Sequence, residues 1–329
     1  MQGISQVRPI DPLLTNFGVE FMQTEEAFVA NDIAPIVPVA GDTGTYYVWE
    51  ARNNFGVETT NWSQSGGAPR TEIRATKDTF GCIKYGLEIA ITDDDRRNSL
   101  DPASLDRRAI NRITRGMMLD RELRFATAIQ ASPDTTLAGT ARWFSTAADP
   151  RGNADTAKQT ILKACGVVPN TLLLAADTFF DLVKNTTATS AGTIIKNAIQ
   201  YVMATTANNL NPSLIAQFFD IERVIVGWAV YEAKSAAAGA GNVSLEPLTI
   251  GTNNVAGTYM WTNIAAFIYV DPNPSNDCLE YYTTFASVPF VADRYREEKT
   301  ESDVLRVKQV LVEKKVCAKA AYVIAGTIA

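Results

Sequence analysis

The stretch DPASLDRRAINRITRGMMLDRELRFATAIQ, residues 101–130, decides the fold. Asp101 can cap a helix, and Pro102 suits the first helical position. Apolar or small side chains then follow at an approximate three- and four-residue spacing, at Leu105, Ala109, Ile113, Gly116 and Leu123. No break comes before Pro133, so we predict one helix over about 101–131, roughly 45 Å long. A helix of this length is a spine on which other elements pack.

The segment before this helix is rich in β signals. Apolar side chains alternate with other residues at Ile83, Tyr85, Leu87, Ile89 and Ile91, which predicts a half-buried strand. We expect residues 45–49 to be its partner, with the turn-rich residues 61–70 between them. A two-stranded ribbon is marginal in water by itself. The predicted β arm therefore rests on another subunit, or it is an edge hairpin of one sandwich.

The two ends of the chain carry different patterns. Residues 33–39 contain two prolines and predict an extended N-terminal arm, with a short helix around 20–31 before them. Near the C-terminus, residues 304–316 and 322–324 predict strands. The apolar positions change phase in the first of these, which predicts a bulge or a twist near 309–312.

The middle of the chain predicts an α/β domain over about 166–272. It follows a helix that Asp155 can cap. Strands are expected at 167–174, 224–226 and 266–270, and helices at 177–184, 194–203 and 212–219.

Composition excludes several classes of function. The chain has 329 residues, 30 basic and 36 acidic side chains, and a formal charge of −6, so no broad positive field would hold nucleic acid tightly. It has no histidine, which removes Ser-His-Asp and Cys-His catalysis and His-ligated zinc. Its longest apolar runs, 224–231 and 264–270, fall far short of the ~18 residues of a membrane helix, and no signal peptide is apparent at the N-terminus.

The candidate chemical motifs favour structural interpretations. We expect the cysteines, whose spacing fits no metal or disulfide pattern, to be buried free thiols: Cys82, Cys165, Cys278 and Cys317. The run 93–95 of three aspartates is interpreted as a solvated turn rather than a metal site. Eight arginines and seven acids occur between residues 93 and 124, which predicts ion pairs along the helix or with neighbouring subunits. No catalytic, cofactor-binding or metal-binding residue is predicted.

At this point the order of elements resembles the major capsid proteins of tailed bacteriophages, which have the Hong Kong-97-type shell fold. The phrases that carry the resemblance are VPNTLLL at 168–174 with the helix at 178–184, RVIVGWAVY at 223–231, residues 261–269 with Pro272-Asn273-Pro274, and the strands within 304–324. The resemblance covers nearly the whole chain, and it lies in the order and spacing of these phrases.

The resemblance implies an α+β fold with five parts. They are an N-arm at 1–40, an E-loop β arm at 41–92, a first part of the P domain at 93–165 with the spine helix, an A domain at 166–272, and P-domain return strands at 273–329. We expect contacts between subunits at the E-loop and spine helix, through Trp62, Arg70, Arg107, Arg108, Arg112 and Arg115.

The implied function is that of a structural shell protein, not an enzyme. Copies would form hexamers and pentamers in the bacterial cytoplasm and become the virion shell. They would meet scaffolding, portal and decoration proteins, and would enclose packaged double-stranded DNA without tight sequence-specific binding, without a cofactor and without a membrane. Two alternatives stay open: an encapsulin-type protein compartment, and a cytoplasmic carboxylate-dependent enzyme.

Overall fold

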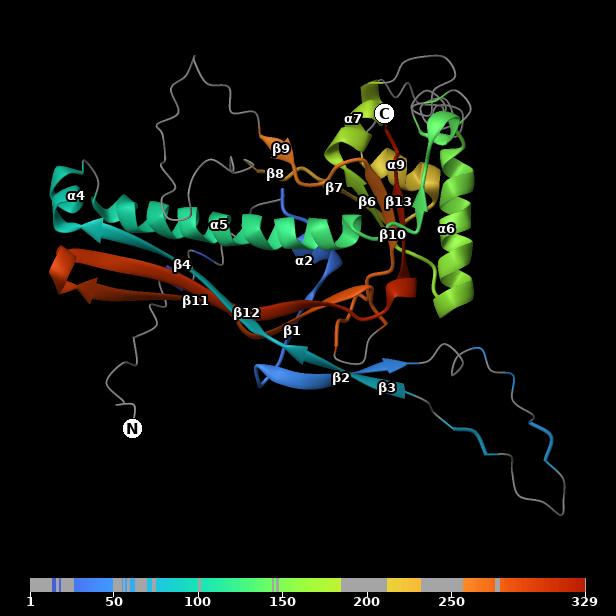
Figure 1. The fold of residues 1–329 in the computed structure, drawn as a ribbon, viewed down its shortest axis with the longest axis horizontal. Coiled ribbons are helices and arrows are strands. Elements are labelled where there is room, and N and C mark those ends of the chain that lie inside the picture. Colours follow the sequence, from blue (N-terminus) through green and yellow to red (C-terminus); the bar gives the residue numbers. More distant parts are fainter. Residues whose placement is uncertain are drawn as a thin grey trace.

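A computed structural model describes residues 14–15, 18, 27–49, 55, 57, 60–62, 70–72, 75–99, 102–143, 145, 148–184, 212–231, 257–275 and 279–328. Figure 1 shows an elongated molecule in which a long helix lies along a narrow sheet, a compact α/β region stands at one end, and a β ribbon projects beside it. None of the described helices has the length and apolar character needed to cross a bilayer.

The long helix α5 (Pro102–Gln130) confirms the predicted spine. It packs on a four-stranded sheet of order β1-β11-β12-β4, formed by β1 (Ile36–Pro38), β11 (Tyr282–Glu297), β12 (Ser302–Lys315) and β4 (Ile83–Thr92). Ile110 and Ile113 of the helix share a buried cluster with Leu305 and Val307 of the sheet. The apolar stripe of the sequence is therefore the face that meets the strands.

A second, five-stranded sheet forms the α/β region. Its order is β5-β13-β10-β6-β7, with β5 (Thr135–Thr136), β13 (Ala321–Ala325), β10 (Ile264–Ile268), β6 (Thr171–Ala175) and β7 (Arg223–Gly227). Helices α6 (Pro150–Cys165), α7 (Ala176–Lys184) and α9 (Pro212–Phe219) contribute to its cores. The sheet draws strands from both sides of 166–272, because β5 and β13 lie outside that range.

The projecting ribbon pairs differently from the sequence expectation. β2 (Thr43–Trp49) is antiparallel to β3 (Ala75–Gly81), whereas β4 pairs with β12. Only Cys82 separates β3 from β4, so one long stretch changes partners at this residue. The predicted pairing of 45–49 with 83–91 was wrong because alternation identifies a strand but not its neighbour.

Other local expectations hold in part. α6 begins after Asp149, whose side chain accepts from Gly152 N, and not after Asp155. The aspartate run 93–95 opens a short helix instead of a turn, and the predicted helix at 194–203 lies outside the described residues. The remaining short elements are α2 (Ala30–Ile33), α4 (Asp93–Asn98), β8 (Val230–Tyr231), β9 (Thr258–Tyr259) and the 3-10 turns η1 (Gly139–Ala141), η2 (Glu298–Thr300) and η3 (Ala318–Ala320).

The predicted bulge falls on the opposite strand. β12 keeps a regular register with β4 through Leu311, and the register shifts occur in β11 between Ala286 and Val291. Val312 changes the apolar phase of β12 because it packs on a separate cluster with Phe80 and Phe285 at the base of the ribbon. Near Val312 both faces of the sheet are covered by other side chains. Apolar residues therefore occur at both odd and even positions of β12 without a change of strand register.

Two buried charged residues of α5, Arg121 and Glu122, join the separate parts of the fold. The Glu122 carboxylate accepts from the backbone N–H of Val29 at 3.2 Å, from that of Ala30 at 2.9 Å and from Trp261 Nε1 at 2.6 Å. Burial raises the pKa of Glu122, and these donors together with Arg121 act in the opposite direction. One carboxylate thus connects the N-terminal segment, the spine and the loop before β10.

The neighbouring Arg121 holds the other side of this joint. It donates to Thr284 Oγ1 at 2.9 Å and to the carbonyl of Ala34 at 3.3 Å, and it lies 3.5 Å from a carboxylate oxygen of Glu313. These partners lie before β1, on β11 and on β12. We name this set around Arg121 and Glu122 the spine joint.

Gly326, which follows β13, packs closely against the backbone of Leu137, which follows β5. Substitution of this glycine therefore tests that packing. Gly326 has a φ of +72°, and a Cβ there would lie 2.3 Å from the Leu137 carbonyl oxygen, whereas Gly139, with a φ of +56°, has open space. We expect Gly139→Ala to cost about 1 kcal/mol for the left-handed backbone alone, and Gly326→Ala to cost about 3 kcal/mol or more. Urea unfolding of the two variants measures both values, and equal costs would contradict the described packing.

Glu280 predicts a pH dependence of stability. Burial raises its pKa from 4.5 to about 7, with a smaller contribution from Asp271, although Thr283 donates to it at 2.7 Å. A raised pKa in the folded state contributes stability below pH 4.5, and this is lost as pH rises through 7. We expect Glu280→Gln to become progressively more stable than the wild type between pH 5 and 8, by no more than about 3 kcal/mol.

The matched control for this prediction is Glu297→Gln. Glu297 also accepts from a threonine three residues on, Thr300, but it is exposed. Its substitution removes an exposed carboxylate and should change the free energy of unfolding by no more than about 0.5 kcal/mol. A pH profile for Glu280→Gln parallel to that of the wild type would show that the Glu280 carboxyl does not titrate differently on folding.

Candidate inter-subunit surfaces

The outward side of α5 carries a basic surface. Arg107, Arg108, Arg112 and Arg115 are all exposed, and positions 108, 112 and 115 follow the helical spacing that places them on one face. Within the described part of the chain, Arg108 and Arg112 have no ion-pair partner. We name these four residues the arginine face.

Several other described charges of this region are paired within the chain. Arg124 lies 3.0 Å from Glu313 and also pairs with Asp120, and Arg97 lies 3.2 Å from Asp94. The predicted near balance of arginines and acids therefore holds for the region as a whole. It does not extend to Arg108 and Arg112, which have no ion-pair partner among the described residues.

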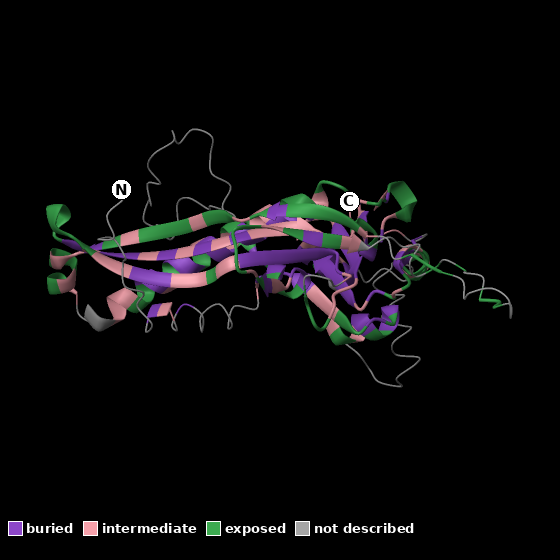
Figure 2. Cartoon of the chain, turned by 90° about the horizontal axis from the view of Figure 1, so that it is seen from below, coloured by how far each residue is buried: buried purple, intermediate pink, exposed green. Residues whose placement is uncertain are grey.

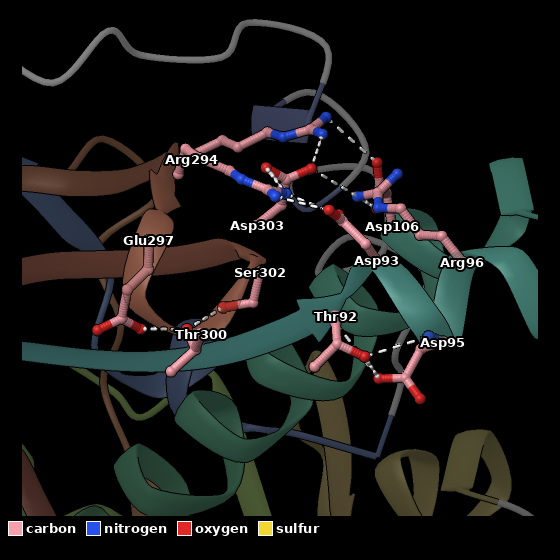
Figure 3. A network of polar contacts seen from close by, with 11 residues as sticks. Thr92, Asp93, Asp95, Arg96, Asp106, Arg294, Glu297, Thr300, Ser302 and Asp303 are labelled. Carbon is pink, nitrogen blue, oxygen red and sulfur yellow. Dashed lines mark hydrogen bonds and ion pairs between the residues drawn. The ribbon is translucent and has the colours of Figure 1, made fainter.

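An ion network closes the far end of the spine. Figure 3 shows arginines and aspartates from α4, α5, β11 and β12 converging at this end. Arg96 lies 2.7 Å from Asp106 and 3.3 Å from Asp303, and Arg294 pairs with both of these aspartates. Positive and negative groups balance, so the network holds four elements together without creating a strong local field.

Two residues of the aspartate run at 93–95 form contacts within the same end of the fold. Asp93 accepts two hydrogen bonds from Arg296, at 2.7 and 2.6 Å, and this contact lowers the pKa of Asp93. Asp95 forms a reciprocal cap with Thr92 at the start of α4. Among the described residues no group of three or more potential ligands could hold a metal ion.

The ribbon is anchored at its base and exposed beyond its last strand pair. Phe80 stacks on Phe285 of β11 at 4.4 Å between ring centroids, and Tyr46 donates to Asp78 at 2.6 Å. Trp62 is 68% exposed and Arg70 is also exposed, while residues 63–69 lie outside the described part. Figure 2 shows the described residues at this extremity as exposed, away from the buried strands of the two sheets.

Sequence reasoning missed an aromatic edge on the α/β region. Phe180 of α7 and Trp228, just after β7, meet edge to face at 5.3 Å, and both remain more than a third exposed. The sequence contained a signal, because Trp228 follows a buried strand directly. It could not show that β7 is the last described strand of its sheet.

The cysteines depart from the expectation of burial. The described ones are free thiols, of which Cys165 is buried whereas Cys82 and Cys317 are half-buried; Cys278 lies outside the described residues. The sequence predicted ion pairs along the helix or with neighbouring subunits for the charges of this region, whereas Arg121 and Glu122 are buried and contact other parts of the same subunit.

No family model matches the chain. Two curated relatives are major capsid proteins. That of Burkholderia phage BcepMu is 25% identical over 244 residues, which cover 70% of this chain and 73% of the relative. That of Pseudomonas phage JBD67 is 26% identical over 148 residues, covering 43% and 47% of the two chains.

Solved structures agree on the fold over nearly the full length. A phage-related protein from Bordetella bronchiseptica superimposes with a TM-score of 0.71 at 20% identity, covering 98% of this chain and 99% of that one. The capsid of cyanophage P-SCSP1u gives a TM-score of 0.56 at 10% identity, covering 91% and 88%. The chain thus has the α+β fold of a solved phage capsid, and its curated sequence relatives are major capsid proteins of phages.

Proposed function

We propose that copies of this chain assemble into hexamers and pentamers, with the ribbon of each copy lying on its neighbour. The observation that carries this proposal is the ribbon itself. Its base is packed on β11, but Trp62 and Arg70 beyond its last strand pair are exposed. A two-stranded ribbon gains stability when an outside surface covers it, and a second copy offers that surface repeatedly around a ring.

The arginine face of α5 is the second proposed contact between copies. Arginine forms directed, paired hydrogen bonds with carboxylates, and the formal charge of −6 means that each copy brings an excess of acids. Arg108 and Arg112 lack an ion-pair partner among the described residues, so a neighbouring copy can neutralise them without breaking an internal contact.

The parts of the fold take the following proposed roles. Residues 1–40 serve as the N-arm, 41–92 as the E-loop, 93–165 and 273–329 as the P domain, and 166–272 as the A domain. The A domains meet at the symmetry axes, where the exposed edge near Trp228 is available for contact.

The proposed shell encloses double-stranded DNA without binding it tightly, in keeping with the acidic balance of the chain. It assembles in the host cytoplasm with scaffolding, portal and decoration proteins and becomes the virion wall. Its role is structural and not enzymatic. Purified protein examined by light scattering and negative-stain microscopy should give capsomers or megadalton particles, and a small soluble oligomer under all assembly conditions would contradict the proposal.

Charge reversal on the arginine face tests the second contact. We expect Arg112→Glu to lower the yield of assembled particles about tenfold or more, because a buried like-charge contact replaces an attractive one. The thermal unfolding midpoint of the unassembled chain should stay within about 2 °C of the wild type, since exposed charges contribute little to folding. Lys163→Glu reverses an exposed charge on α6 and should leave the yield unchanged. Equal yields for both variants would contradict this contact.

Deletion of residues 55–72 tests the ribbon. The deletion leaves β2 and β3 joined by a short loop, so the two sheets should fold as before, with an unchanged circular dichroism spectrum. Capsomers should fail to close, because the part proposed to cover the neighbour is missing. Normal particles from the shortened chain, seen by electron microscopy, would refute the role of the ribbon.

A further inference from the structure

Two cysteine thiols face each other where the two sheets meet. Cys165 is the last residue of α6, and Cys317 lies between β12 and η3. Their Sγ atoms are 3.7 Å apart although 152 positions separate them in the sequence. α6 packs against η3, so the backbone on both sides is held in contact.

The backbone of each cysteine is fixed by hydrogen bonds nearby. Cys317 N donates to the carbonyl of Glu280 at 3.0 Å, and the Cys317 carbonyl accepts from Ala320 N at 3.1 Å. Beside Cys165, the N–H of Gly166 donates to the Leu162 carbonyl at 2.8 Å and ends α6. Rotation of the two side chains is then the main change needed to bring the sulfurs to the ~2.05 Å of a disulfide.

We propose that Cys165 and Cys317 are a redox pair that closes to an intramolecular disulfide when the protein meets a disulfide oxidant such as oxidised glutathione. The Cys317 thiolate attacks one sulfur of the oxidant, forms a mixed disulfide and releases one glutathione thiolate. The Cys165 thiolate then attacks Sγ of Cys317 and releases the second glutathione thiolate. The two cysteines lose two protons and two electrons, and the oxidant is reduced to two glutathione thiols.

Exposure sets the order of these steps. Cys317 is half-buried and can be reached from solvent, whereas Cys165 is 6% exposed. Burial, followed by the proximity of Cys317, raises the pKa of Cys165 to about 12, which nearby Lys319 partly offsets. Since the thiolate is the reacting form and burial still disfavours it once Cys317 is in the mixed disulfide, the second step should be slow at neutral pH and accelerate as the pH rises.

The disulfide would fasten the two sheets to each other. It joins the end of α6 to the connection between β12 of the four-stranded sheet and β13 of the five-stranded sheet. A bridge that closes so long a loop strongly restricts the unfolded chain. If the proposed function holds, the pair stays reduced during assembly in the cytoplasm and closes after release into oxidising surroundings. The formation of the disulfide itself does not depend on assembly.

The test uses the full chain, unassembled and fully reduced, incubated with oxidised glutathione at pH 8. Non-reducing peptide mass mapping should find a cross-linked peptide that contains both Cys165 and Cys317. The thermal unfolding midpoint should rise by about 3–6 °C and return to its starting value with dithiothreitol. Cys82→Ser is the matched control, because Cys82 is also half-buried, and it should keep both effects.

Three further variants make the outcome decisive. Cys317→Ser should abolish the cross-link and the shift, whereas Cys165→Ser should retain a glutathione adduct on Cys317 because no second thiol displaces it. Cys278→Ser should leave the cross-link intact. A bridge between Cys278 and Cys317, or a lasting adduct on Cys317 in the wild type, would overturn the proposal. Because every reading is taken before assembly, a failure to form particles would bear only on the proposed function.

Discussion

Two adjacent opposite charges inside α5 determine how the parts of this protein fit together. Burying Arg121 and Glu122 is unfavourable unless each charge finds hydrogen-bond partners. Those partners come from three distant places: the N-terminal segment at 29–34, the loop at Trp261, and strands β11 and β12. None of the three is local to the spine. The charges are therefore satisfied only when the N-terminal segment and both sheets have docked on the helix, which makes the arrangement mutual and specific.

Such a joint explains why a chain of this shape can be rigid without a single large core. The buried side chains of the described residues divide into four clusters, and the largest surrounds the spine joint where the two sheets meet. The ribbon packs only at its base, through Phe80 on Phe285, and it gains nothing from the joint. The elements that contact the spine joint form the body of the subunit. The ribbon lies beyond the joint, so further stabilisation of it needs contact with another surface.

The sequence was informative where structure is local. Helical spacing and proline placed the spine at 102–130, and alternation identified β4, because both patterns depend on neighbours in the chain. The pairing of β4 was predicted wrongly, because its partner β12 lies more than 200 positions away in the sequence. A local pattern does not identify so distant a partner. Arg121 and Glu122 looked like two surface charges among many, because burial depends on tertiary packing. Arg108 and Arg112 show the same limit: counting charges gave near balance, but only the contacts show that these two have no ion-pair partner in the described part of the chain.

The distribution of charge along the spine is itself evidence of its use. At one end, Arg96 and Asp106 belong to a balanced ion network, and further along Arg121 and Glu122 are satisfied inside the protein. In both places the charges form contacts within the subunit that stabilise its fold. Between them the helix presents exposed arginines, with Arg112 lacking an ion-pair partner in the described part of the chain. A folding requirement would be met equally by neutral polar residues at those exposed positions. Their charge fits the contact proposed above, in which an acidic surface on another copy of this chain would neutralise them.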